Sequence, residues 1–149
     1  MRLPGAKVAW RASVIAAAIL VGTGSYTFWF ARGYSYLLDD PEVCINCHIM
    51  RDNYHSWDRS SHQEITCNDC HVPHTLVAKW LTKAENGFHH SVAFTFGPPE
   101  VIHARPRTRR LIQRNCLYCH GEMVMLVRGT EEWRDRFCFD CHRGVGHAY

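Results

Sequence analysis

The cysteines and histidines of this sequence recur in one pattern, Cys-x-x-Cys-His. The pattern occurs four times and uses all eight cysteines: Cys44, Cys47 and His48; Cys67, Cys70 and His71; Cys116, Cys119 and His120; and Cys138, Cys141 and His142. At this spacing two thiols bond the vinyl groups of a haem, and the adjacent imidazole ligates its iron. A zinc ribbon does not need a histidine after each cysteine pair, and a thioredoxin-like motif would occur once. The pattern therefore predicts four covalent c-type haems.

The four motifs are arranged as two pairs, 44–71 and 116–142. Eighteen residues separate the first two motifs, 44 separate the second from the third, and 17 separate the last two, which resembles a duplicated two-haem unit. The stretch 97–110, with three prolines and several arginines, predicts an extended linker between the pairs. Because so short a chain has little side-chain core, we expect a mainly α-helical domain with much irregular structure, held together by its haems.

An uncharged, largely apolar run of 20 residues, 12–31, is long enough as a helix to cross the hydrocarbon core of a membrane. Basic residues precede the run and acidic residues follow it, so residues 1–11 should be cytoplasmic and residues 32–149 periplasmic. The sequence thus predicts a haem domain on a single anchor in the bacterial inner membrane, in contact with lipid. The alternative is a cleaved signal peptide, whose apolar region is normally shorter.

The net charge of +3 gives no reason to expect nucleic acid as a partner. The basic residues are scattered along the chain, and the only dense cluster lies between Arg105 and Arg110.

A low-spin haem needs a second axial ligand, and seven histidines lie outside the motifs. His62 lies five residues before Cys67, and His147 lies five residues after His142, so each is near one haem in the chain but cannot serve the same face of it. We expect both to ligate other haems. For the remaining candidates His55, His74 and His103 a structural role is the better interpretation.

Met50 follows the first motif histidine, His48, by two residues, so both approach the first iron from the same side. If Met50 is the ligand, the potential of that haem is higher than that of a bis-histidine haem. The alternative is that Met50 packs on the porphyrin, and the spacing alone does not decide between the two.

The segment 75–86, TLVAKWLTKAEN, predicts a short helix for which Gly87 is the expected stop. Four side chains that can hold or move a proton lie in and after it: Lys83, Glu85, His89 and His90. A quinol releases two protons with its two electrons, so these groups are candidates for a quinol-oxidising site. The alternative is that the lysines line a solvated face or meet lipid head groups.

Several segments together resemble the NapC/NirT family of quinol dehydrogenases. The resemblance covers nearly the whole chain and rests on the single anchor, the two motif pairs and these short sequences: Cys47-His48-Ile49-Met50, Ser61-His62, Cys70-His71-Val72-Pro73, Lys83 to Gly87 and Cys141 to His147. It implies a tetrahaem cytochrome c that oxidises menaquinol and passes electrons to the catalytic subunit of a periplasmic multihaem reductase.

The resemblance also implies roles for individual residues. Met50 would ligate the first haem in place of His48, and Lys83 would line the quinol pocket. The other implied ligands are His71, His120 and His142 as proximal and His62 and His147 as distal ligands; a remaining distal position would be filled by the partner, with a lysine as the family precedent. The family often has an aspartate where this chain has His90, which leaves the spin state of the first haem open.

Two other functions are alternatives to the oxidation of quinol with delivery of the electrons to a nitrite reductase. One is a general electron donor of the same family that serves other periplasmic reductases. The other is an electron-transfer cytochrome without its own quinol site. A terminal reductase is not expected, because so small a chain cannot enclose a protected substrate-binding haem.

Overall fold

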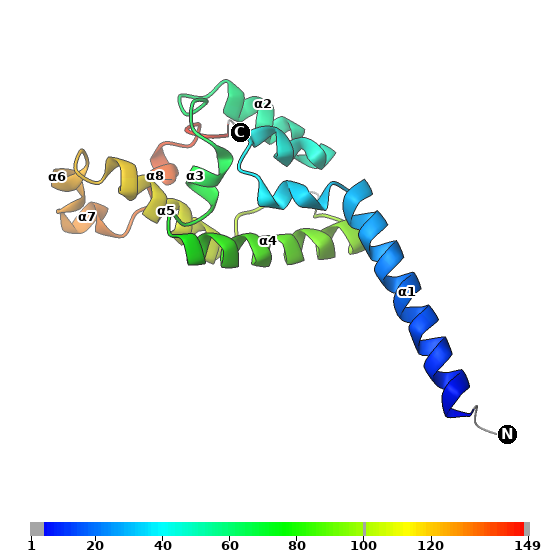
Figure 1. Ribbon diagram of the computed structural model, residues 1–149. Coiled ribbons are helices and arrows are strands. Elements are labelled where there is room, and N and C mark those ends of the chain that lie inside the picture. Colours follow the sequence, from blue (N-terminus) through cyan, green and yellow to red (C-terminus); the bar gives the residue numbers. More distant parts are fainter. Residues whose placement is uncertain (1–4, 100, 148–149) are drawn as a thin grey trace. The chain divides into compact units, whose positions relative to one another are not determined.

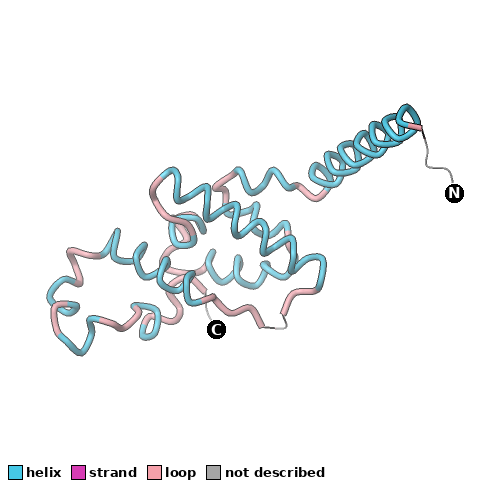
Figure 2. The backbone as a smooth tube through the Cα atoms, turned by 90° about the horizontal axis from the view of Figure 1, so that it is seen from below, coloured by secondary structure: helices cyan, strands magenta, loops and turns pink. Residues whose placement is uncertain are grey.

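The computed structural model describes residues 5–99 and 101–147. These residues form helices joined by loops, and none of them lies in a β-strand (Figure 2). The prediction of a mainly α-helical chain with much irregular structure is confirmed. The chain divides into two units, which are described separately.

The first unit, which ends at Leu38, contains the helix α1 (Ala6–Phe30) and the 3₁₀ helix η1 (Gly33–Leu37). Within the described part of the chain, α1 is the one helix long and apolar enough to cross a membrane, with a mean hydropathy of 1.5 and no buried residue. It begins six residues before the predicted span 12–31 and ends one residue before its end. A helix with apolar side chains on all sides needs an apolar surrounding such as lipid.

The second unit runs from Asp39 and carries all four Cys-x-x-Cys-His motifs (Figure 1). Its helices are short except for two. They are η2 (Pro41–Asn46), η3 (His48–Met50), α2 (Arg51–Asp58), α3 (Cys67–His71), α4 (Leu76–Phe96), α5 (Pro106–His120), α6 (Met125–Arg128), α7 (Glu131–Arg134) and α8 (Cys138–Cys141).

The polypeptide contributes a very small core of its own. Val72 and Leu111 are the buried apolar side chains of the described residues, whereas the buried polar side chains of the second unit are Lys83, Gln113 and Asn115. So few buried apolar groups cannot offset the entropy of ordering a domain of this size. This is the composition expected of a domain whose haems supply most of the apolar interior.

Two buried amides on α5 hold the motifs together. The side-chain amide of Asn115 donates to the carbonyls of Cys70 and Val72, at 2.9 and 2.8 Å, and so joins α5 to the end of α3. The Gln113 carbonyl accepts from the backbone N–H of Cys138 at 2.8 Å and joins α5 to the start of α8. Buried polar groups are costly unless paired, so these bonds fix the mutual positions of three motifs.

The prediction that a short helix stops at Gly87 is wrong, because α4 continues through this residue to Phe96. A glycine inside a helix costs only about 1 kcal/mol relative to alanine, which favourable contacts elsewhere in the helix offset. The helix ends at Gly97, whose φ of 94° lies in the region that other residues avoid.

The prediction of an extended linker over 97–110 is also wrong in its second half. α5 begins at Pro106, and a proline is favourable in the first helical turn because its missing N–H has no partner there. The linker is therefore confined to the residues between Phe96 and Pro106.

Candidate haem centres and quinol site

Three of the four motifs are helical, and the first is not. In α3, α5 and α8 the two cysteines are three residues apart in an α-helix and lie on one face, together with the histidine that follows. His142 lies just past α8, but its N–H still donates to the Cys138 carbonyl at 3.0 Å. In the first motif η2 ends at Asn46, and Cys47 is extended, with φ −96° and ψ 116°. His48 is therefore not presented as the other three motif histidines are.

Successive motifs lie beside one another. The Cys44 and Cys67 thiols are hydrogen-bonded, which lowers the pKa of Cys44 to about 7 and raises that of Cys67. Burial, followed by the neighbouring Cys138, raises the pKa of Cys116 to about 11. Burial likewise raises the pKa of Cys70, with smaller effects from Asp69 and then Cys119. The neighbours follow the order of the motifs along the chain, as an electron-transfer chain requires.

Two motif histidines face a histidine from outside the motifs. The ring centroids of His62 and His120 are 6.0 Å apart, and those of His71 and His147 are also 6.0 Å apart. Two imidazoles on one iron, each at about 2 Å, have centroids about 6 Å apart. Both pairs thus have a spacing that would fit bis-histidine ligation of the second and third haems, and ligation by His62 and His147 stays a prediction.

Hydrogen bonds orient both distal rings. The Nδ1 atom of His62 lies 3.1 Å from the Ser61 hydroxyl, and Nδ1 of His147 lies 3.0 Å from the carbonyl of Asn53. These bonds leave Nε2 free for a metal, which is the usual arrangement of a ligating histidine. Desolvation lowers the pKa of the facing His71 to about 4, with a further contribution from His147, so this imidazole is neutral and able to ligate.

The described residues do not form an ordinary metal site. Nowhere among them do three histidine, cysteine or acidic side chains come close enough to hold one metal ion. All eight cysteines are free of disulfide bonds. Zinc needs four ligands in a tetrahedron, whereas a haem iron takes one protein ligand on each face. The paired histidines and free cysteine pairs therefore fit c-type haems and do not fit zinc or a disulfide framework.

His48 and Met50 differ in their surroundings. They lie two residues apart in η3, a 3₁₀ helix with three residues per turn, so their side chains point in directions about 120° apart. His48 is exposed to solvent and Met50 is half-buried. Only one of them can point toward a given iron, and the half-buried thioether is the better placed.

His142 of the fourth motif lines an open hollow with residues of a distant loop. Its neighbours there include Ser61 and Cys141. Within the described chain, neither His142 nor His48 has a ring contact with another histidine. The first and fourth motifs therefore differ from the second and third, whose histidines are paired.

A buried lysine and a carboxylate lie beside the first motif. Lys83 on α4 is only 7 % exposed and donates to Oδ1 of Asp39 at 2.8 Å. Lys79 donates to the other oxygen, and Asn68 of the second motif donates to Oδ1 at 2.6 Å. Hydrogen bonds from Lys79 and Lys83 lower the pKa of Asp39 to about 2. The pKa of the Cys44 thiol is lowered most by its hydrogen bond with Cys67, and the charge of Lys83 also lowers it. The Lys83 ammonium therefore lies near the first haem attachment.

The continuous helix α4 separates the other three predicted proton-handling residues. Lys83 and His90 are seven residues apart, about two turns, and share one side of the helix. Glu85 and His89 lie on another side, where Glu85 pairs with Arg107 at 2.6 Å and His89 packs edge-on against Phe88. Partial desolvation lowers the pKa of His90, followed by the charge of Arg105 and by His89. The helix places Lys83 and His90 on one side, and Glu85 and His89 on another.

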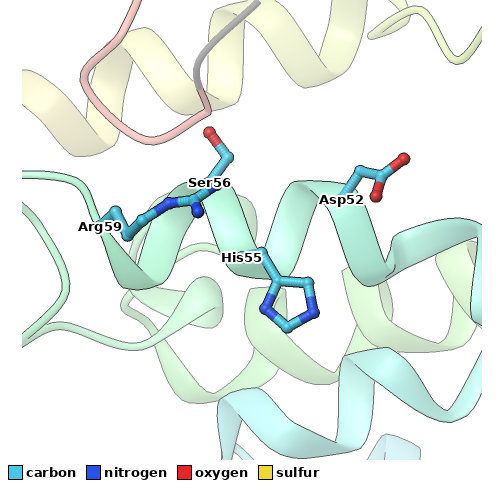
Figure 3. Close-up of a pocket in the computed structure, with 4 residues that line it drawn as sticks. All are labelled: Asp52, His55, Ser56 and Arg59. Atoms are coloured by element: carbon cyan, nitrogen blue, oxygen red, sulfur yellow. The ribbon is translucent and has the colours of Figure 1, made fainter.

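Histidines predicted to be structural contact tyrosines. His74 stacks on Tyr118 with ring centroids 4.2 Å apart, and His55 meets Tyr54 edge-on. A shallow hollow on α2 is lined by Asp52, His55, Ser56 and Arg59, but His55 and Ser56 point to opposite sides of the helix (Figure 3). This hollow contains none of the predicted site residues.

Comparisons with known proteins agree with these features. The family model described as the NapC/NirT cytochrome c family, N-terminal region, matches residues 6–149. The chain belongs to the NapC/NirT cytochrome c family. The match includes α1 and all four motifs, so the protein is a membrane-anchored cytochrome c with c-type haems.

Two relatives carry the name NrfH. The cytochrome c-type protein NrfH of Wolinella succinogenes is 34 % identical over 91 % of this chain and 84 % of its own length. The cytochrome c nitrite reductase subunit NrfH of Nitratidesulfovibrio vulgaris is 37 % identical over 78 % of this chain and 72 % of its own length. A solved structure, a cytochrome c nitrite reductase NrfHA complex bound to the inhibitor HQNO, has a chain that matches with a TM-score of 0.64 at 32 % identity, over 89 % of this chain and 88 % of that one.

Reasoning from the sequence missed Asp39 as a site residue. It was noticed only as one of the acidic residues that follow the membrane segment. Its partners Lys79 and Lys83 are 40 and 44 residues away, so no local pattern connects them. The one available signal was a pair of lysines four residues apart on a predicted helix, which needs an acidic partner if the lysines are buried.

Proposed function

We propose that this protein is the tetrahaem, quinol-oxidising subunit of a cytochrome c nitrite reductase, which takes electrons from menaquinol and passes them to a periplasmic multihaem reductase. The observation that carries the proposal is the division of the motifs into two kinds. The second and third motif histidines face another histidine, whereas the first and fourth face none among the described residues. When bound, the haems supply one-electron redox chemistry. The choice of nitrite reductase as the partner rests on the names of the NrfH relatives and of the NrfHA complex.

The first motif is proposed as the entry point for electrons. Here Met50 is proposed as the axial ligand in place of His48, because η2 ends before Cys47 and the thioether is the half-buried side chain. A thioether raises the potential of an iron relative to two imidazoles, which favours accepting an electron.

Lys83 is proposed to bind and orient the quinol. Asp39 accepts from Lys83 and holds its ammonium close to Cys44, and Trp80 lies 5.3 Å from the same ammonium. An ammonium is a hydrogen-bond donor only, so it stabilises the oxygen of a quinol as negative charge develops on it. Asp39, with a pKa of about 2, is a poor proton acceptor at neutral pH.

His90 is proposed to accept protons from the quinol. Its lowered pKa keeps the imidazole neutral at neutral pH, and a neutral imidazole can take up a proton at its unprotonated ring nitrogen. His90 lies two turns along the same side of α4 as Lys83. One residue thus orients the hydroxyl, and the other takes its proton.

The fourth motif is proposed as the exit point toward the reductase. His142 lines an open hollow and has no described histidine opposite it, so a ligand from the partner subunit can complete its iron. We propose that α1 crosses the inner membrane with the haem domain in the periplasm, since haem attachment to cysteines and the charge asymmetry around the anchor both favour that side.

The test is quinol oxidation by the full-length, haem-loaded protein in liposomes, followed by haem absorbance after mixing with a reduced menaquinone analogue. We expect rapid haem reduction, and at least about a tenfold slower rate for Lys83→Ala, because a charge-assisted hydrogen bond to the quinol is lost. Lys79→Ala, one turn earlier with the same carboxylate partner, is the matched control and should slow the reaction less. Failure of the wild-type protein to react with the quinol would leave a plain electron-transfer cytochrome.

A further inference from the structure

We propose that the apolar face of α4 is a second membrane-binding surface, which lies in the lipid interface parallel to the bilayer. The proposal depends on α1 anchoring the chain and not on the quinol chemistry. It concerns Val77, Leu81, Phe88 and Val92 of the long helix α4 (Figure 1), defined here as the apolar stripe of α4. By the periodicity of the helix these residues lie opposite the side that carries Lys83.

The stripe has the spacing of one helix face. Its residues follow one another at intervals of four, seven and four, so they stay on the same side over four turns. Val77 is 71 % exposed, and Leu81 and Phe88 are each 66 % exposed. Glu85, which pairs with Arg107, lies beside the stripe between Leu81 and Phe88. A soluble surface rarely exposes this much apolar surface along one helix unless something covers it.

The two sides of the stripe have the residues of a lipid interface. Arg105 and Arg107, both exposed, lie on one side through their ion pairs with Glu85. Trp80, which is partly exposed, lies on the other side. Arginine meets anionic head groups and tryptophan prefers the boundary between head groups and acyl chains, so the sides match the layers of a bilayer surface.

The chain also keeps α4 near a membrane. Asp39 follows the last residue of α1 by nine residues and accepts hydrogen bonds from Lys79 and Lys83 in the first half of α4. A tether this short gives the stripe a high effective concentration at the surface that α1 crosses. A lipid surface is therefore a more available occupant than a second protein.

The experiment uses the full-length, haem-loaded protein in liposomes of phosphatidylcholine and phosphatidylglycerol that contain a lipid with a photoactivated diazirine in its acyl chain. Mass spectrometry of the peptides then shows where the carbene has inserted. We expect adducts on Val77, Leu81 and Phe88 as well as on α1. Leu126 of α6 is 85 % exposed and also apolar, and it should carry none.

A paired substitution tests the stripe itself. Leu81→Gln with Phe88→Gln should reduce labelling of α4 by at least about fivefold, because polar side chains do not enter the acyl region, while labelling of α1 is unchanged. Met123→Gln with Leu126→Gln, in α6 and the turn before it, is the matched control and should change neither. The haem content shows whether each variant has folded. If a variant has not folded, the labelling pattern of the wild-type protein alone decides whether α4 contacts lipid.

Two results would overturn the proposal. One is labelling of α1 without labelling of α4, which means that water covers the stripe. The other is an unlabelled α4 in protein that chemical cross-linking shows to be dimeric through this helix, which means that a second copy covers it. Labelling of neither helix would show that α1 does not anchor the chain, a failure of a different premise.

Discussion

The two inner haem motifs and the two outer ones differ in what the chain provides for their irons. His71 and His120 of the inner motifs each face a histidine at a ring-centroid distance of 6.0 Å, and the buried amide of Asn115 joins the two inner motifs. His48 and His142 of the outer motifs are exposed and have no such partner among the described residues.

This difference separates conduction from exchange. A haem ligated by the chain on both faces changes little in structure when its iron gains or loses an electron, which suits a relay. A haem with one face left open can respond to a substrate or to a partner protein, which suits the ends of the path. We propose that the chain supplies both axial ligands of the two inner haems and that the outer haems depend on a substrate or a partner protein.

The largest expected effect comes from removing a distal ligand of an inner haem. His62→Ala or His147→Ala should convert one haem to the high-spin state and slow electron transfer to the reductase by at least about a hundredfold, since loss of a ligand exceeds the effect of losing its supporting groups. Low-temperature EPR and steady-state nitrite reduction measure the two effects. His55→Ala is the control and should leave both unchanged.

A substitution of His55 that altered the spin state as His62→Ala does would remove the distinction between ligating and structural histidines. The comparison would then rest on chance proximity of the rings.

The sequence was sufficient to predict the cofactor, but not which distal histidine pairs with which motif histidine. The Cys-x-x-Cys-His spacing is set by haem chemistry, so c-type haems are predicted without a structure, and the family match agrees; their number, four, stays a prediction. The pairing of His62 with His120 joins residues 58 apart, and that of His71 with His147 joins residues 76 apart; only the fold decides such pairs. The sequence excluded the nearest haem for each distal histidine and left the choice among the others open.

The same limit explains the errors in the helices. Gly87 and the prolines of 97–110 are local signals, and local signals are overridden when packing rewards a longer helix. This error affected the predicted quinol site. With a helix that ends at Gly87, the residues Glu85, His89 and His90 were grouped with Lys83, whereas the continuous α4 keeps only His90 on the side of Lys83.

Removing each of the two candidate ligands of the first haem in turn tests the comparison at the proposed entry point for electrons. Met50→Ala should slow reduction by the quinol analogue by about thirtyfold, because the first iron loses its ligand, whereas His48→Ala should slow it by less than about threefold. Redox titration followed by absorbance locates the change in the first haem. A larger effect of His48→Ala would make the first motif an ordinary one.

The pH dependence of quinol oxidation tests the proton acceptor at the same end. The lowered pKa of His90 keeps its imidazole neutral until the pH falls below the ordinary histidine range, at about 6.5, and the rate should decline only below that range. His90→Asn should slow the reaction about tenfold at neutral pH and abolish this decline. Asp39, with a pKa of about 2, should contribute no titration between pH 5 and 8.

Rates measured from pH 5 to 8 for both proteins decide the point. An unchanged acidic limb in the variant would assign the proton acceptor to another residue.

The smallest expected effect comes from the support of a distal ligand. Ser61→Ala removes the hydroxyl that contacts Nδ1 of His62 and should slow electron transfer to the reductase by about threefold, since one neutral hydrogen bond is worth about 1 kcal/mol. His62 should remain bound, so the EPR spectrum should stay low-spin. A high-spin haem in this variant would show that the hydrogen bond decides ligation itself.

The most direct test of the division into inner and outer haems is low-temperature EPR of the oxidised, full-length protein, recorded with and without a quinol analogue. We predict that two low-spin signals stay unchanged, while a signal from an outer haem shifts when the analogue binds and is no longer affected by it in Lys83→Ala. Four low-spin signals that ignore the analogue would contradict the account, because every iron would then be completed by the chain alone.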